Sequence, residues 1–187
     1  VSDRAIRSLQ KLGSEAVPSL IKIAESGDTN AISSLGFMGD SRALKPFTLL
    51  LEDDNKEVCK AAIGGFGNLH HENVKIPESV VEKLINLIDS QDKEIRKETI
   101  HVLGQIGATQ AVEPIIEFLD IIVRQDDIIE YGNPNYYPYL NAIRALGDLG
   151  DKRAVAPLLK ILEKEKAPSI LDSITQALQK LGHEVEE

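Results

Sequence analysis

Apolar residues recur along this chain at positions i, i+3, i+4 and i+7, a spacing that places them on one side of an α-helix. The pattern occurs five times, in the sets Val17/Leu20/Ile21/Ala24, Leu44/Phe47/Thr48/Leu51, Val81/Leu84/Ile85/Ile88, Val112/Ile115/Ile116/Leu119 and Val155/Leu158/Leu159/Leu162. We call the predicted helices A helices. A second series of apolar segments predicts partner helices, which we call B helices: Val58/Ile63/Phe66, Ile95/Ile100/Leu103 and Leu140/Ile143/Leu146.

A short motif with two favoured glycine positions ends the B segments. It reads LGFMG at 35–39, FGNLH at 66–70, LGQIG at 103–107 and LGDLG at 146–150, with degenerate copies at 9–13 and 178–182. A final glycine suits the residue after a helix, where φ is positive. Successive motif ends are 26, 31, 37, 43 and 32 residues apart. This period predicts stacked helical hairpins, an α-solenoid, because each hairpin alone would leave an apolar face uncovered.

Local signals support the predicted helix ends. Proline is tolerated in a first helical turn, where Pro18, Pro46, Pro114 and Pro157 are expected to lie. We expect three polar residues upstream of A helices to act as N-caps, namely Asp40, Thr109 and Asp151. The segment 54–57 has the spacing of a capping box, with Asp54 as the predicted cap.

The segments GDSRALKP at 39–46 and GDKRAVAP at 150–157, together with LGQIG and LGDLG, resemble the HEAT-like repeat named for phycobilisome lyases. The resemblance extends from about Ala5 to Gly182. It implies an all-α fold of the α-α superhelix class, a right-handed α-solenoid of HEAT-like hairpins with the B helices on the concave side. Proteins with such repeats include bilin lyase subunits, deoxyhypusine hydroxylase and many scaffolds.

We expect residues 1–187 to form a single domain of about five repeats. A lone B-type helix at 5–12 opens the chain, and an insertion at 120–138 interrupts the fourth repeat between its A and B helices. His70 stands where the motif at 66–70, which ends the third repeat, would have its last glycine.

The charge and composition of the chain limit the classes of molecule that it is expected to bind. The net charge of −9 disfavours nucleic acid, whose phosphates need clustered Lys and Arg. A solubilising surface is the favoured interpretation of the charge, and a patch for a basic partner is the alternative. No apolar run is long enough to span a membrane, and no signal peptide is visible. A single cysteine, Cys59, allows no internal disulfide and favours the cytoplasm.

All four tyrosines fall in or beside the insertion, at Tyr131, Tyr136, Tyr137 and Tyr139. The surrounding residues are rich in Gly, Asn and Pro, which predicts a loop. Tyrosines on a loop held by rigid helices are frequent interface anchors. The alternative is that the rings pack back onto the helices.

The exposed face of the B helices is the second candidate surface for a protein partner. Its candidate residues are Phe37, Lys60, Asn68, Lys97, His101, Gln105, Arg144 and Asp148. The alternative is a solvated wall without a ligand, and Phe37 could equally belong to the core.

Catalytic and metal-binding signals are weak. His70, His71 and Glu72 are adjacent in sequence and therefore do not share one helix face. Deoxyhypusine hydroxylase carries His-Glu pairs at the starts of B helices, whereas this chain has Lys60-Ala61 and Lys97-Glu98 there, so that resemblance implies no metal site. We therefore expect no catalytic residue, metal or cofactor, and a non-enzymatic scaffold that binds another protein. The alternative is a bilin lyase-like chromophore-binding factor or subunit.

Overall fold

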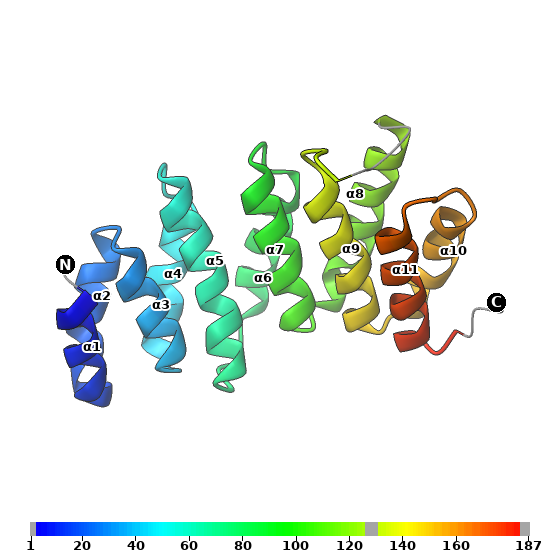
Figure 1. The fold of residues 1–187 in the computed structure, drawn as a ribbon. Coiled ribbons are helices and arrows are strands. Elements are labelled where there is room, and N and C mark those ends of the chain that lie inside the picture. Colours follow the sequence, from blue (N-terminus) through cyan, green and yellow to red (C-terminus); the bar gives the residue numbers. More distant parts are fainter. Residues whose placement is uncertain (1–2, 126–130, 184–187) are drawn as a thin grey trace. The chain divides into compact units, whose positions relative to one another are not determined.

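The computed structural model describes residues 3–125 and 131–183, and within these ranges every regular element is helical (Figure 1). The chain divides into two compact units, unit 1 at 1–84 and unit 2 at 85–187. We describe each unit by itself. The all-α class is confirmed, while a single domain over 1–187 stays a prediction.

Unit 1 contains two complete helical hairpins and a further B-type helix that precedes them. Its elements are α1 (Asp3–Lys11), η1 (Gly13–Ala16), α2 (Val17–Glu25), α3 (Thr29–Phe37), η2 (Ser41–Ala43), α4 (Leu44–Leu50), α5 (Lys56–His71) and the start of α6 (Glu78–Asn86). Helix α3 packs along α5, while α2 and α4 cover them as A helices (Figure 1). Helix α1 is the predicted lone B-type helix, and it packs against α3.

Unit 2 repeats the arrangement with three B helices. Its elements are η3 (Leu87–Asp89), α7 (Lys93–Gln105), η4 (Thr109–Ala111), α8 (Val112–Gln125), α9 (Tyr136–Leu149), η5 (Lys152–Ala154), α10 (Val155–Leu162) and α11 (Pro168–Lys180). Helix α9 lies between α7 and α11, and the A helices α8 and α10 pack against α9 and α11 respectively (Figure 1). The hairpins predicted from the apolar spacing are therefore confirmed in both units.

The two glycines of the motif have different roles. The last glycine ends the helix in the left-handed region, as predicted, with φ of 62° at Gly39 and 68° at Gly150. The first glycine allows consecutive B helices to approach closely, a role that the sequence did not show. A Cβ atom on Gly147 would lie 2.8 Å from the Cα of Ala177, and one on Gly104 would lie 3.0 Å from the Cβ of Ala145.

The third motif, which lacks its last glycine, ends its helix differently. Helix α5 continues through His70 to His71, and Asn73 takes the left-handed conformation with φ of 65°. Asparagine tolerates this region better than most other non-glycine residues, so the left-handed turn forms at Asn73, three residues after the position of the missing glycine.

Two of the predicted N-caps are wrong. Ala108 precedes η4, so the Thr109 side chain does not cap it. Helix α5 is capped by Asn55, whose Oδ1 accepts from the backbone N–H of Glu57 at 3.0 Å, and not by Asp54. Asp40 and Asp151 do cap the turns η2 and η5, as predicted.

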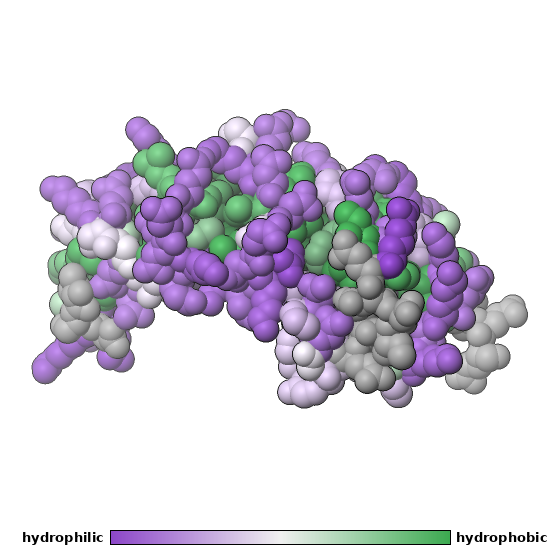
Figure 2. Space-filling model, turned by 90° about the horizontal axis from the view of Figure 1, so that it is seen from above, coloured by the Kyte–Doolittle hydropathy of each residue, from purple (hydrophilic) through white to green (hydrophobic). Residues whose placement is uncertain are grey.

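The core of each unit lies between its A and B helices. In unit 1, Phe47 and Phe66 pack edge to face with ring centroids 5.8 Å apart. Cys59 is buried there, its Sγ 3.2 Å from the carbonyl oxygen of Leu51. Hydrophilic residues cover most of the face seen in Figure 2, and hydrophobic residues show between them.

Candidate functional site

The tyrosines lie at or just before the start of α9. Of the predicted insertion 120–138, residues 120–125 belong to α8 and residues 136–138 to α9, so the loop predicted around Tyr136 and Tyr137 is wrong, while Tyr131 does lie in a turn. Tyr136, Tyr137 and Tyr139 belong to the first turn of the helix, and Tyr131 precedes it. The helix forms because Asn133 starts a turn: its Oδ1 accepts from the N–H of Asn135 at 2.8 Å, and its carbonyl accepts from the N–H of Tyr136 at 3.0 Å. Pro138 follows in the first turn, where no donor is missed. The insertion residues 126–130 lie outside the described residues.

Two of the four predicted anchors are buried. Tyr139 is 1% exposed and Tyr136 is 8% exposed, so their rings pack within unit 2 rather than offering surface to a partner. Burial raises the pKa of the Tyr139 hydroxyl, with a smaller contribution from the nearby Glu165 carboxylate. The Tyr136 hydroxyl lies 2.8 Å from the Oγ of Ser169, which connects α9 to α11.

The other two tyrosines are exposed and touch a buried one. Tyr131 is 80% exposed and Tyr137 is 52% exposed. Their rings meet edge to face, with centroids 5.8 Å apart between Tyr131 and Tyr136 and 5.3 Å apart between Tyr136 and Tyr137. Hydrogen bonding with Tyr131 is the main cause that raises the pKa of Tyr137. We call Tyr131, Tyr136 and Tyr137 the tyrosine cluster.

Arg96 fixes the base of the tyrosine cluster to α7. Its guanidinium donates to the carbonyl oxygen of Ser90 at 2.6 Å and to Oδ1 of Asn135 at 2.8 Å. The carbonyl of Asn135 in turn accepts from the N–H of Tyr139 at 2.8 Å. The start of α9 is thus held on one side by α7 and on the other by α11. Nothing in the sequence pattern distinguishes Arg96 from a surface arginine, so it was not among the predicted site residues.

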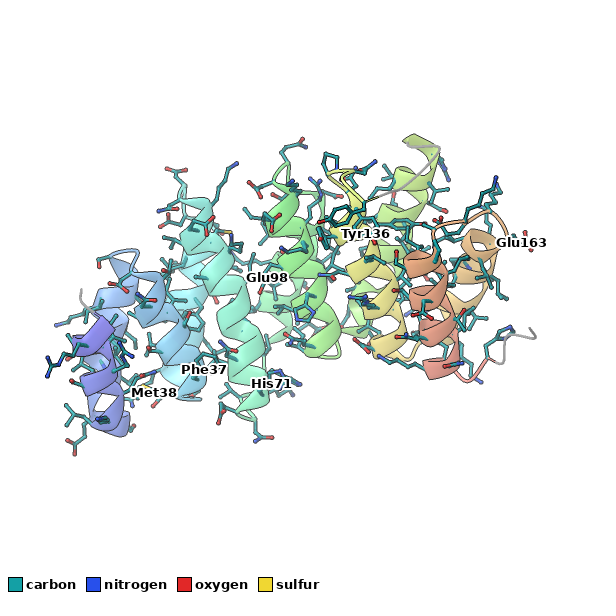
Figure 3. The ribbon with its side chains drawn as sticks, in the orientation of Figure 1. Phe37, Met38, His71, Glu98, Tyr136 and Glu163 are labelled. Carbon is teal, nitrogen blue, oxygen red and sulfur yellow. The ribbon has the colours of Figure 1, made fainter. Side chains whose placement is uncertain are left out.

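In unit 1, the predicted B-helix face contains a solvent-exposed ring. Phe37 is 61% exposed at the end of α3 (Figure 3), so it is not part of the core. Lys60 and Asn68 lie half-exposed on α5, and Lys60 forms an ion pair with Glu57 at 2.9 Å. The structure therefore provides one aromatic contact here among polar neighbours.

In unit 2, the predicted B-helix face is polar and partly neutralised. It comprises Lys97, His101 and Gln105 on α7 with Arg144 and Asp148 on α9, all of them at least partly exposed. Lys97 pairs with Glu94 on its own helix, and Asp148 accepts from Lys180 of α11 at 2.5 Å. Among the residues that the structure describes, Arg144 has no ion pair.

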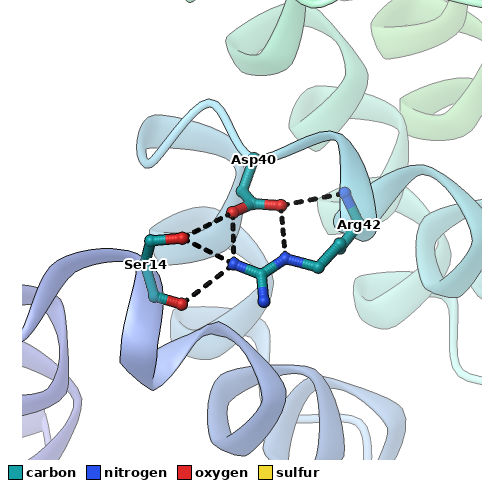
Figure 4. Close-up of polar contacts among 3 residues, drawn as sticks. All are labelled: Ser14, Asp40 and Arg42. Atoms are coloured by element: carbon teal, nitrogen blue, oxygen red, sulfur yellow. Dashed lines mark hydrogen bonds and ion pairs between the residues drawn. The ribbon is translucent and has the colours of Figure 1, made fainter.

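A Gly-Asp-x-Arg turn joins consecutive hairpins in both units. In unit 1, Arg42 donates from Nη2 to Oδ2 of Asp40 at 2.6 Å and to the carbonyl oxygen of Ser14 at 2.9 Å (Figure 4). In unit 2, Arg153 binds Asp151 at 2.7 Å and Glu113 at 3.1 Å. The arginine hydrogen bonds lower the pKa of Asp40 and of Asp151 to about 2. The motif is thus a clamp between repeats.

Neither a metal-binding cluster nor a membrane-spanning helix is found in residues 3–125 and 131–183. No group of three or more His, Cys, Asp and Glu side chains there could hold a metal ion. The rings of His70 and His71 lie 6.4 Å apart at the end of α5. None of the helices in 3–125 and 131–183 is both long and apolar enough to cross a membrane.

Comparison with known proteins agrees with the hairpin architecture. Residues 45–126 match the model for HEAT repeats, and residues 138–164 match that for the PBS lyase HEAT-like repeat. No curated protein sequence matches. The complex of CpcE and CpcF of phycocyanin lyase from Nostoc sp. PCC7120 contains a similar chain, with a TM-score of 0.70, 22% identity and 86% of this chain covered. This chain covers 64% of that one, less than two thirds of its length.

Two designed proteins have a similar fold. A designed armadillo repeat protein in complex with the peptide (KR)4 gives a TM-score of 0.60 at 18% identity, covering 96% of this chain and 91% of that one. A second designed armadillo repeat protein gives 0.56 at 20% identity, covering 96% and 92%. At these identities the likeness shows the fold alone.

Proposed function

The chain is a HEAT-like repeat protein of the phycobilisome lyase type, and on that basis we propose that it is a non-enzymatic scaffold that binds another protein. Helical repeats of this kind form large, rigid side-chain surfaces, which suit protein recognition. The cytoplasmic location stays a prediction.

The observation that carries the proposal is the exposed and anchored tyrosine cluster. Tyr131 and Tyr137 present large apolar rings to solvent although the chain has only four tyrosines and no tryptophan. Their support is rigid, because Arg96 and Ser169 hold the start of α9 from both sides. A rigid aromatic anchor loses little conformational entropy on binding, which is the usual property of an interface hot spot.

The polar B-helix face supplies the second part of the proposed surface. In unit 2, Tyr137 lies on the same side of α9 as Arg144 and Asp148, since these positions follow one another at helical spacing. A partner centred on the tyrosine cluster could therefore extend along α9, with the polar residues forming the rim.

The test compares three immobilised proteins in a lysate of the source organism: wild type, Tyr131→Ala/Tyr137→Ala and Phe37→Ala. The last is a matched control, because it also removes an exposed ring without changing charge. We expect a protein that wild type and Phe37→Ala retain and the double variant loses. Retention of no protein by wild type would refute the scaffold proposal. Equal retention by all three would exclude the tyrosine cluster as the surface.

The second candidate is a bilin lyase-like chromophore-binding factor or subunit. The match of residues 138–164 to the PBS lyase HEAT-like repeat supports it. Because the chain has no tryptophan, tyrosine fluorescence would report a bilin bound near the cluster. Quenching at stoichiometric bilin, with an induced circular dichroism band in the visible region, would favour this candidate over the first, whereas an unchanged spectrum would remove it.

A further inference from the structure

The two exposed tyrosines of the cluster meet through their hydroxyl groups. The side chains of Tyr131 and Tyr137 are hydrogen-bonded, and a tyrosine side chain makes such a bond through its phenolic oxygen. Their ring centroids lie 6.3 Å apart, with an interplanar angle of 79°. The ring carbons next to each oxygen, which are the ortho carbons, therefore lie close to the contact between the two rings.

These two phenols are also the ones that solvent reaches. Tyr131 and Tyr137 are exposed, whereas Tyr136 and Tyr139 are buried, and the chain has no further tyrosine. The hydroxyl of Tyr136 is in addition engaged with the Oγ of Ser169 at 2.8 Å. A solvent-borne oxidant thus meets two phenols in this chain, and the two are neighbours.

The backbone before α9 holds Tyr131 next to the helix and leaves its ring free to adjust. Gly132 follows with φ of 104°, a conformation that side-chain-bearing residues rarely adopt. Tyr137 stands on the first turn of α9, which Arg96 and Ser169 hold from both sides. Exposed side chains change rotamer on a timescale of about picoseconds to nanoseconds, so the Tyr131 ring closes onto a fixed partner without rearrangement of the fold.

We propose that Tyr131 and Tyr137 are an oxidative cross-linking site, at which a one-electron oxidant of the haem peroxidase class, supplied with hydrogen peroxide, joins the two rings as dityrosine. Each phenol loses one electron and its hydroxyl proton, and the two phenoxyl radicals form a carbon–carbon bond between their ortho carbons. The hydrogen on each bonded carbon then moves as a proton to the oxygen of its own ring, which restores both phenols. Hydrogen peroxide takes up the two electrons and two protons and leaves as two molecules of water.

Proximity favours a bond within one chain over a bond between two chains. Well-oriented groups in one molecule react with effective molarities that reach about 10⁵ M, far above any concentration of the protein in solution. The bond would tie the turn that contains Tyr131 to α9. This inference is independent of the proposed scaffold function, because it needs no partner protein.

The experiment oxidises the full chain in dilute solution with a haem peroxidase and hydrogen peroxide. The blue fluorescence of dityrosine reports the product, and no tryptophan obscures it. Trypsin cleaves after Arg124 and Arg144 and leaves all four tyrosines in one peptide, 125–144. A bond within the chain lowers the mass of this peptide by two hydrogens, whereas a bond between chains links two copies of it.

Three variants identify the pair. Tyr131→Phe and Tyr137→Phe each keep the ring but remove one of the two hydroxyl groups that the reaction needs. Tyr139→Phe is the matched control, because it removes a buried phenol from the same helix. Circular dichroism confirms that each variant is folded.

We expect wild type and Tyr139→Phe to give the peptide that lacks two hydrogens in yields within about twofold, and Tyr131→Phe and Tyr137→Phe to give at least roughly tenfold less. Fragment ions from backbone cleavage between Tyr131 and Tyr137 should be absent, since the new bond closes a loop there. Equal yields in all variants, a bond that involves Tyr136, or a product made only of linked chains would overturn the proposal.

Discussion

Units 1 and 2 are built from the same hairpin and the same Gly-Asp-x-Arg clamp, yet their surfaces differ. Unit 1 has a small net charge, and the large apolar ring that its described residues expose on the B-helix face is Phe37. Unit 2 has most of the net negative charge and an anchored group of three rings at the start of α9. The repeat thus determines the backbone of both units, while departures from the repeat supply the features that a partner can recognise.

Replacing the first glycine of the motif should cause the greatest loss of stability. It tests whether the close contact between consecutive B helices tolerates a side chain equally in both units. A Cβ on Gly147 meets the Cα of Ala177 at 2.8 Å, whereas one on Gly36 meets the Cβ of Asn68 at 2.9 Å and its nearest backbone atom, the carbonyl oxygen of Gly65, at 3.2 Å. The backbone of the neighbouring helix is closer at Gly147, so Gly147→Val should lower the free energy of unfolding by about 3 kcal/mol and Gly36→Val by less. Urea denaturation measures both. Equal losses would show that the two contacts are equivalent.

Loss of Arg96, which holds the tyrosine cluster of unit 2 in place, should have the next largest effect on stability. Arg96→Leu removes two charge-assisted hydrogen bonds, one of them to Asn135 at 2.8 Å. We expect a loss of about 2 kcal/mol of stability and easier quenching of tyrosine fluorescence by acrylamide, because the start of α9 loosens. Arg144→Leu is the control and should change stability by less than about 0.5 kcal/mol. If the two variants are quenched alike, Arg96 does not position the cluster.

The clamps present in both units should make stability depend on acid. The pKa values of Asp40 and Asp151 are lowered to about 2 from 3.8, so both carboxylates stabilise the fold above pH 4. This contribution is lost as the pH falls through about 2, because protonation breaks the arginine contacts. Asp40→Asn/Asp151→Asn keeps side-chain caps but removes the charge. Its stability deficit, measured by urea denaturation, should shrink between pH 5 and 2, and a constant deficit would contradict the assignment.

Removal of a buried hydroxyl group in unit 2, that of Thr99, should have the smallest effect and should stabilise the fold. Thr99 is fully buried, and its Oγ1 has no hydrogen-bond partner among the described residues. Unit 1 has alanine, Ala31 and Ala62, at the equivalent positions. Thr99→Val keeps the shape and removes the unsatisfied hydroxyl, so we expect a gain of up to about 1 kcal/mol. Thermal unfolding decides the sign, and a loss would mean that the hydroxyl does have a partner.

The sequence predicted the hairpins well because helical spacing and final glycines are local signals. Asp40 caps a helical turn and Gly150 takes the left-handed conformation after a helix, as predicted from their residue types. It failed at the insertion, because Asn, Gly and Pro are typical both of a loop and of a helix start. A helix starts here because the side chain of Asn133 accepts from the N–H of Asn135 and its carbonyl accepts from the N–H of Tyr136. Amino-acid composition does not reveal these hydrogen bonds. The burial of Tyr139 and the anchoring by Arg96 depend on contacts between α9 and its neighbours, which no local pattern contains.

The glycine contacts between B helices also define a length scale. Helices that meet through Gly104 and Ala145, or Gly147 and Ala177, approach toward the short end of interhelical distances, about 8 Å. An extended polypeptide advances about 3.3 Å per residue. An extended peptide that crossed α7, α9 and α11 would thus reach the next helix every two to three residues. The glycine motif, by fixing the spacing of the B helices, therefore determines which side chains of such a peptide would contact them.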